Sequence, residues 1–161
     1  MDQDAFRETY REINECFCIY EKPILMNRCH CPQAARFCIA EREGVECRSL
    51  SAQQQCREFL DSLRENARFA LKSRSPETPL PHAKAMRLLM GGLLGLHRIR
   101  YPGDPTPVLI ANVHGLLNDC IGHFGGIQRL PFARIIQQLA EYREPRRRTR
   151  RQRDKGPPED T

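Results

Sequence analysis

The fold is decided by the stretch CFCIYEKPILMNRCHCPQAARFCIAEREGVECRSLSAQQQC, residues 16–56. This stretch holds seven of the eight cysteines of the chain: Cys16, Cys18, Cys29, Cys31, Cys38, Cys47 and Cys56. Thiolates ligate soft metals, and sulfur-rich sites are typical of zinc, copper(I) and iron–sulfur clusters. We therefore predict that the segment wraps a metal centre, with all seven cysteines as candidate ligands.

The context of the cysteines favours metal binding over disulfides. The first residues, MDQDAFRETYREINE, lack the basic and then apolar pattern of a signal peptide. No window reaches the roughly 18 consecutive apolar residues that a membrane span needs. These features predict a cytoplasmic protein without a membrane span, and in that compartment thiols stay reduced. Disulfides or a thiol switch remain the alternative for the cluster of cysteines.

The choice of ligands rests on density, because the spacing matches no common zinc or ferredoxin pattern. The first four candidates lie where the sequence has no long period: Cys29, Cys31, Cys38 and Cys47. Cys56 is next, in the first turns of a predicted helix, and Cys16 and Cys18 follow near the end of another. Four thiolates suit an iron–sulfur cluster of the [4Fe–4S] type, and zinc is the alternative because four cysteines also complete a zinc site.

A cysteine-ligated cluster predicts a function in electron transfer, in redox sensing or in the maturation of a larger redox enzyme. The partner would be a redox protein or a client enzyme. Four protein thiolates leave no iron open, so no catalytic residue is predicted. The alternative is a zinc-stabilised interaction or nucleic-acid-binding regulator. A thiol enzyme built on Cys120 and His123 is a third hypothesis, but Cys120 continues an apolar helical stripe and is predicted to be a core residue.

Hydrophobic periodicity predicts an all-α fold of about five helices with an irregular cysteine-rich segment between the first two. The expected helices cover residues 4–20, 51–72, 82–100, 108–124 and 131–142. Ser51 is the expected cap of the second helix, and only a short helix is expected within 33–42. Three regions follow: a cysteine-rich region at 1–75, a helical bundle at 76–144 and a disordered arginine-rich tail at 145–161. No strand is expected, because no segment alternates convincingly.

Two further features refine this outline. The pair Gly91-Gly92 lies inside the third predicted helix, where each glycine costs about 1 kcal/mol relative to alanine, so another backbone or a bound group is expected close by. The formal net charge of +6 belongs mostly to the tail, because the chain from Arg143 onward carries eight basic and four acidic residues. The tail could bind phosphates, but it lacks the interleaved aromatic residues of a nucleic-acid reader.

Overall fold

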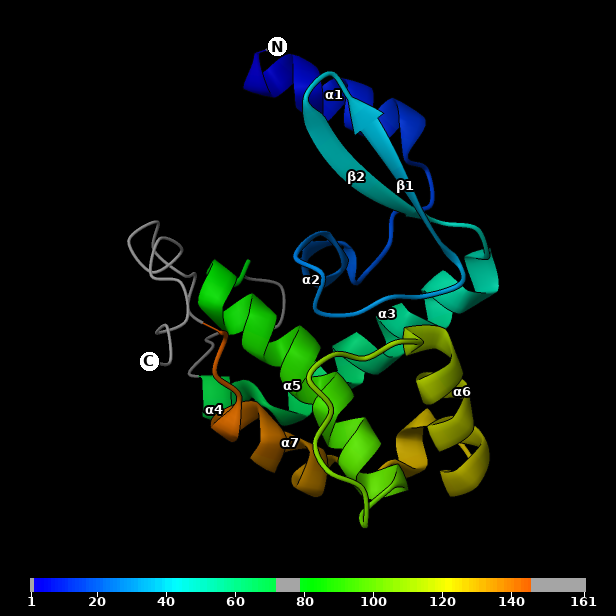
Figure 1. Ribbon diagram of the computed structural model, residues 1–161, viewed down its shortest axis with the longest axis vertical. Coiled ribbons are helices and arrows are strands. Elements are labelled where there is room, and N and C mark those ends of the chain that lie inside the picture. Colours follow the sequence, from blue (N-terminus) through cyan, green and yellow to red (C-terminus); the bar gives the residue numbers. More distant parts are fainter. Residues whose placement is uncertain (1, 72–78, 146–161) are drawn as a thin grey trace, which may run out of the picture.

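The computed structural model describes residues 2–71 and 79–145, and its helical body is built around α5 (His82–Arg100). The helices α3 (Leu50–Asn66), α6 (Val113–Phe124) and α7 (Phe132–Glu141) lie against α5 (Figure 1). The short α4 (Arg68–Leu71) follows α3, and the 3-10 turn η1 (Ile127–Arg129) joins α6 to α7. The predicted third helix is confirmed with its bounds.

Glycines let α7 approach α5 closely, as the Gly91-Gly92 pair predicted. A Cβ atom added to Gly91 would lie 2.9 Å from the Cα of Leu139, and one added to Gly95 would lie 2.9 Å from the carbonyl oxygen of Ile135. Gly92 faces the other way, where a Cβ would lie 2.5 Å from Cδ2 of Leu63 on α3. The glycines therefore serve contact between helices, on two sides of α5.

The cysteine-rich segment contains a β-hairpin, so the prediction of an all-α fold is wrong and the fold is mixed α and β. The strands β1 (Ala34–Ile39) and β2 (Arg42–Cys47) pair antiparallel, with Ala34 opposite Cys47 and Ile39 opposite Arg42. The tight turn between them puts the non-glycine Ala40 at a φ of 55°. Because this turn lacks the Asn-Gly or Asp-Gly signal of most two-residue hairpins, the sequence did not reveal it. The short helix expected within 33–42 is therefore also wrong.

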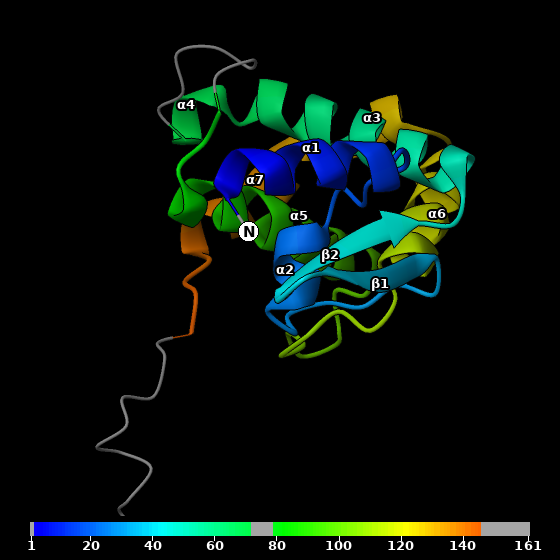
Figure 2. The same ribbon diagram turned by 90° about the horizontal axis from the view of Figure 1, so that it is seen from above.

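The first helix is shorter than predicted. The helix α1 (Gln3–Ile13) ends at Asn14, and the chain then runs extended beside β2 before α2 (Glu21–Leu25) begins. The backbone N–H of Cys18 donates to the carbonyl of Val45 at 3.0 Å, and that of Cys47 donates to the carbonyl of Cys16 at 2.7 Å. Pairing with β2 thus takes residues 16–18 out of the helix. In Figures 1 and 2 the hairpin and α1 lie side by side at one end of the helical body.

The caps of two later helices differ from the predicted starts. The side chain of Ser49, not Ser51, accepts the N–H of Ala52 at 3.1 Å and caps α3. The side chain of Asn112 accepts the N–H of Gly115 at 2.8 Å, so α6 begins at Val113 and residues 108–112 are a loop. Side-chain oxygens at these positions satisfy the free N–H groups of a first helical turn.

The loop before α6 pairs with the cysteine-rich segment. The N–H of His30 donates to the carbonyl of Ile110 at 2.8 Å, and the N–H of Ile110 donates to the carbonyl of Arg28 at 3.2 Å. Cys29 and Ile110 thereby form a parallel bridge. Side chains of the cysteine-rich segment enter the same hydrophobic core as those of the helical body, among them Tyr20, Ile24, Cys29 and Val45.

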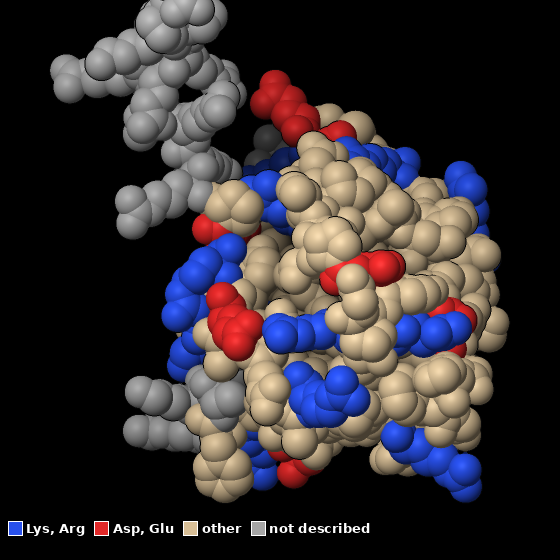
Figure 3. All heavy atoms as spheres, turned by 60° about the horizontal axis from the view of Figure 1, so that its bottom comes forward, with Lys and Arg blue, Asp and Glu red and all other residues tan. Residues whose placement is uncertain are grey.

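Within residues 2–71 and 79–145, no helix has both the length and the apolar character to cross a membrane. Residues 72–78 and nearly all of the predicted arginine-rich tail lie outside the described residues. On the face shown in Figure 3, lysine and arginine side chains alternate with aspartate and glutamate, and uncharged side chains separate them. That face does not present the continuous basic surface that would attract a phosphate backbone.

Candidate functional site

Four cysteines from four separate segments line one small enclosed cavity, which we call the thiol pocket. Its sulfur-bearing residues are Cys18, Cys31, Cys47 and Cys56. They come from the α1–α2 connection, the α2–β1 connection, the end of β2 and the second turn of α3. The remaining wall is mostly apolar. The convergence is a product of the tertiary fold, because no two of these cysteines are adjacent in the sequence.

Backbone pairing holds each of the four in place. The segment at 16–18 is hydrogen-bonded to β2, which positions Cys18 relative to Cys47. Cys31 precedes β1, and its carbonyl accepts the N–H of Ala34 at 3.1 Å. The thiol of Cys47 donates to the carbonyl of Ser49 at 3.1 Å, next to the cap that starts the helix carrying Cys56. The hairpin therefore organises the segment for which the sequence predicted a metal as organiser.

The surroundings of the thiols keep them protonated. Burial raises the pKa of Cys18 and that of Cys56 to about 12, and the neighbouring thiols raise both further. Burial also raises the pKa of Cys47, against a hydrogen bond with the Ser49 backbone that lowers it. A thiol with a raised pKa is a poor nucleophile at neutral pH, because only the thiolate reacts. The pocket is therefore not suited to covalent thiol catalysis.

The other three predicted cysteines lie outside the lining of the thiol pocket. Cys29 is fully buried beside it, and burial raises its pKa to about 12. Cys16 lies on the extended segment, where its thiol is hydrogen-bonded to that of Cys47. Cys38 is exposed on β1. Of the first four predicted ligands, the structure thus brings together Cys31 and Cys47, and places Cys29 and Cys38 elsewhere.

The next feature is the arrangement of possible metal ligands. Among residues 2–71 and 79–145, no group of three or more His, Cys, Asp or Glu side chains is arranged to hold a metal ion. The prediction that a metal gives the cysteine-rich segment its shape is therefore wrong for these residues. The segment takes its shape from the hairpin and from its pairing with the loop at 108–112.

Sequence reasoning missed the polar residues of the thiol pocket, among them Tyr20 and His114. Both line it, and the Tyr20 hydroxyl and the His114 Nδ1 are buried without a hydrogen-bond partner. Tyr20 and His114 fall within the predicted helices at 4–20 and 108–124. Only the tertiary arrangement brings them to the cysteines, and no local pattern signalled it.

The Cys120–His123 pair does not form a reactive site. Cys120 is fully buried between α5 and α6, where its thiol donates to the carbonyl of Leu96 at 3.6 Å. Burial raises the pKa of Cys120 to about 12, while the ring of His123 packs edge-on against Phe124. The buried position that the apolar stripe predicted for Cys120 is confirmed.

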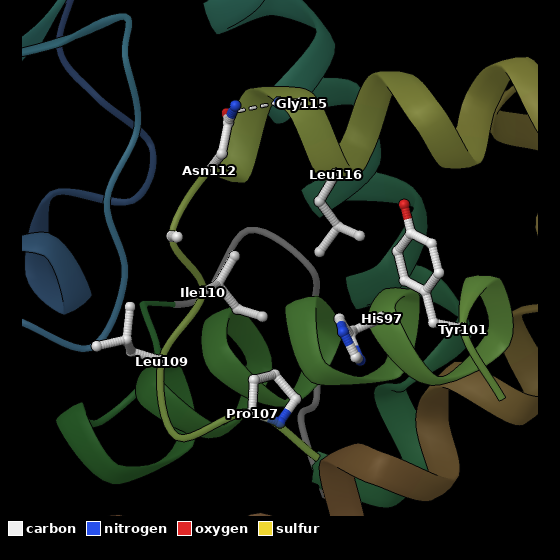
Figure 4. A pocket seen from close by; sticks show the side chains of 9 residues that line it. His97, Tyr101, Pro107, Leu109, Ile110, Asn112, Gly115 and Leu116 are labelled. Carbon is white, nitrogen blue, oxygen red and sulfur yellow. Dashed lines mark hydrogen bonds between the residues drawn. The ribbon is translucent and has the colours of Figure 1, made fainter. Parts of the chain in front are cut away.

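A second hollow, of about 330 Å³, lies between the end of α5 and the loop before α6 (Figure 4). His97 and Tyr101 reach it from α5 with ring centroids 5.2 Å apart, and Leu109 and Ile110 reach it from the loop. The polar side chains here have structural roles: Asn112 caps α6, and the Tyr101 hydroxyl donates to Asp119 at 2.6 Å. The thiol pocket is therefore the better candidate site.

Comparison with known proteins adds no assignment, because no family model, no curated protein and no solved structure matches this chain.

Proposed function

We propose that the thiol pocket binds a [4Fe–4S] cluster and that the protein functions as an iron–sulfur protein. One observation carries the proposal: four thiols, delivered by four separate segments, line a single enclosed cavity. Four cysteine thiolates are the complete protein ligand set of such a cluster. In this proposal the fold brings the four thiols to one cavity, and their side chains rotate to bind the cluster, because no group among the described residues is already arranged to hold a metal ion.

The size of the cavity restricts the ligand. Its volume is about 20 Å³, far below the roughly 300–1,000 Å³ of pockets for organic cofactors and drug-sized molecules. A nucleotide, flavin or haem is thus too large, and a compact inorganic group is the alternative. A [4Fe–4S] core is also larger than this cavity, so the proposal requires each cysteine to turn about its one side-chain torsion and make room for the cluster.

The charge of the pocket favours a cationic ligand. Burial raises the pKa of Cys18 and of Cys56, so these thiols are neutral at neutral pH. A metal centre supplies positive charge, so its binding displaces the thiol protons. A cubane cluster bonds each thiolate to a different iron, so its ligands surround a group several atoms wide.

The position of Cys18 indicates where a partner would approach. Cys18 and Ile19 also line a second, open pocket of about 330 Å³, together with Lys22. Apolar side chains of α3 and α5 complete this pocket, including Leu60 and Leu88. A cluster with four protein thiolates has no open iron, so we propose that it passes electrons to a protein partner that covers this opening and does not catalyse a reaction itself.

Anaerobic reconstitution with iron and sulfide tests the proposal. The full chain should take up four irons and four sulfides per molecule, the content of the proposed cluster, and should gain broad visible absorbance. The single variants Cys18→Ser, Cys31→Ser, Cys47→Ser and Cys56→Ser should lose most of that iron. Cys38→Ser is the matched control, because Cys38 is the exposed cysteine of the hairpin, and it should load like the wild type.

Two outcomes would overturn the proposal. One is a folded wild-type chain that takes up neither iron nor sulfide. The other is loss of iron in Cys38→Ser equal to that in the four pocket variants. Circular dichroism before loading shows whether each variant is folded, and Cys56→Ala, which keeps a small apolar side chain on α3, serves if Cys56→Ser unfolds.

A further inference from the structure

Two free thiols lie opposite each other where the chain leaving α1 pairs with β2. Phe17 and Glu46 form an antiparallel bridge, which places Cys16 opposite Cys47. The backbone N–H of Cys47 donates to the carbonyl of Cys16 at 2.7 Å. Opposite residues of an antiparallel pair have their side chains on the same face. The two sulfurs are therefore neighbours, and the thiol of Cys16 is hydrogen-bonded to that of Cys47.

The register of this pairing suits a disulfide between these two positions. The Cα atoms of opposite residues are about 4.5–5.5 Å apart, within the roughly 4.4–6.8 Å that a disulfide spans. Cys18 lies on the same face two residues later, but it is opposite Val45 and is only a diagonal neighbour of Cys47. Diagonal neighbours are about 7–8 Å apart, too far for a disulfide unless the backbone moves. The register therefore selects Cys16 as the partner of Cys47.

Both residues are also accessible to a small oxidant. Cys16 and Cys47 are partly exposed, whereas Cys29 and Cys120 are buried. Because the backbone is already paired, the motion needed to join the sulfurs is rotation of the two side chains. The Cys47 thiol gives up its 3.1 Å hydrogen bond to the carbonyl of Ser49 in this motion, and a covalent bond replaces it.

We propose that Cys16 and Cys47 are a redox modification site, which forms a disulfide on reaction with a low-molecular-weight disulfide such as oxidised glutathione. One cysteine sulfur loses its proton and attacks the oxidant, which gives a mixed disulfide and one glutathione thiol. The second cysteine loses its proton and attacks the sulfur of the first, and the second glutathione leaves as a thiol. The two cysteines are oxidised by two electrons, and one glutathione disulfide is reduced to two thiols.

The disulfide changes both the thiol pocket and the fold around it. It removes the free thiol of Cys47, one of the four that line the pocket. It also closes a covalent loop from residue 16 to residue 47, which contains α2 and β1. Cross-links of this kind stabilise a protein mainly by restricting the unfolded chain. The modification goes beyond the proposed function and does not depend on it, because the bond forms in the iron-free protein.

The test treats the reduced, iron-free full chain with oxidised glutathione, blocks the remaining thiols with N-ethylmaleimide and maps the linked peptides by mass spectrometry. The wild type should lose two free thiols and join Cys16 to Cys47, and dithiothreitol should reverse the change. Trypsin leaves Cys16 and Cys18 in one peptide, so fragment ions assign the linked sulfur. Cys16→Ser should lose the link. Cys18→Ser is the matched control and should keep it, because Cys18 is opposite Val45.

Thermal unfolding provides a second measurement. The oxidised wild type should have a Tm about 5–10 °C above that of the reduced protein, and Cys16→Ser should show no such increase. Circular dichroism before oxidation shows whether each variant is folded, and alanine replaces serine in a variant that unfolds.

Three outcomes overturn the proposal. One is a wild-type chain in which Cys47 is linked to any other cysteine. Another is a mixed glutathione disulfide that persists at Cys16 or Cys47. The third is no reaction under conditions that oxidise the urea-unfolded chain. A failure to take up iron and sulfide would overturn the proposed function and leave the disulfide standing, so the two proposals fail separately.

Discussion

The hydroxyl of Tyr10 donates a 2.6 Å hydrogen bond to Oε2 of Glu21, and the same oxygen accepts the backbone N–H of Val45 at 2.8 Å. One carboxylate oxygen thus joins α1, α2 and β2. Residues 16–18 connect α1 to α2 and are hydrogen-bonded to β2. The position of Cys18 in the thiol pocket therefore depends on a contact that involves no cysteine.

We expect Glu21→Gln to lower the free energy of unfolding by about 1–3 kcal/mol, because the charged acceptor of both hydrogen bonds is lost. Tyr10→Phe should cost about 1 kcal/mol, since it removes one of the two. Urea unfolding followed by circular dichroism measures both. Glu15→Gln, an exposed neighbour, is the control and should change little. Equal stability of the Glu21 and Glu15 variants would contradict the role given to this contact.

Two helical glycines should respond in opposite ways to alanine. Gly91→Ala should destabilise the protein by about 1–3 kcal/mol, because the new methyl group meets the backbone of Leu139 at 2.9 Å. Gly122→Ala on α6 has nothing within 4 Å and should stabilise it by about 0.5–1 kcal/mol through helix propensity. Thermal unfolding of the two variants provides the measurement. A stabilised Gly91→Ala would show that α5 and α7 are further apart than described.

The cap of α3 can be tested with two neighbouring serines. Ser49→Ala should cost about 1 kcal/mol, because the N–H of Ala52 loses its acceptor. Ser51→Ala removes a hydroxyl that lies 3.0 Å from that of Ser49 but does not cap the helix, so its cost should be below about 0.5 kcal/mol. Denaturant midpoints distinguish them. A larger cost for Ser51→Ala than for Ser49→Ala would show that Ser51 caps the helix.

The thiols should differ in their reaction with iodoacetamide. Cys38 is exposed and should be alkylated first in the folded, iron-free protein. Cys18, Cys29 and Cys56 should react slowly at neutral pH, because burial raises their pKa to about 12 and blocks access. Mass spectrometry of timed samples follows each site, and urea-unfolded protein gives the reference rates. Fast labelling of Cys18 or Cys56 would mean that the thiol pocket is open.

A surface pair predicts a pH dependence. The hydrogen bond from Tyr101 holds the pKa of Asp119 below its ordinary value, and the nearby Arg100, with Nε 2.9 Å from Oδ2, lowers it further. A carboxyl group whose folded-state pKa is lowered stabilises the fold at pH values above its ordinary pKa. That stability is lost as the pH falls through the folded-state pKa. Tyr101→Phe should move the Asp119 titration, followed by carboxyl NMR, to higher pH. An unchanged titration would rule out the Tyr101 contact as its cause.

The helical body could be predicted from the sequence where one period persists. Residues 82–100 repeat apolar side chains over five turns, and the predicted helix is confirmed. The hairpin could not be predicted in this way. Residues 34–39 alternate poorly, and the turn relies on Ala40 at a positive φ, which only the pairing of the strands enforces. Long-range pairing thus overrides local propensity in the cysteine-rich segment.

The candidate site, like the fold, could be predicted from the sequence only in part. The density of cysteines directed attention to residues 16–56 from the sequence alone. Which of them meet could not be deduced, because Cys18 reaches the pocket only through pairing with β2 and Cys56 only through the docking of α3. His114 comes from a helix more than fifty residues later, and no spacing rule relates it to the cysteines.

The bridge between Cys29 and Ile110 affects how the protein is synthesised. The ribosome makes the cysteine-rich segment early, but the strand of backbone that holds residues 28–30 emerges only when residue 110 has been translated. Until then the backbone of residues 28–30 lacks this partner. A polypeptide that ends before residue 110 would therefore contain all seven clustered cysteines without the segment that pairs with Cys29.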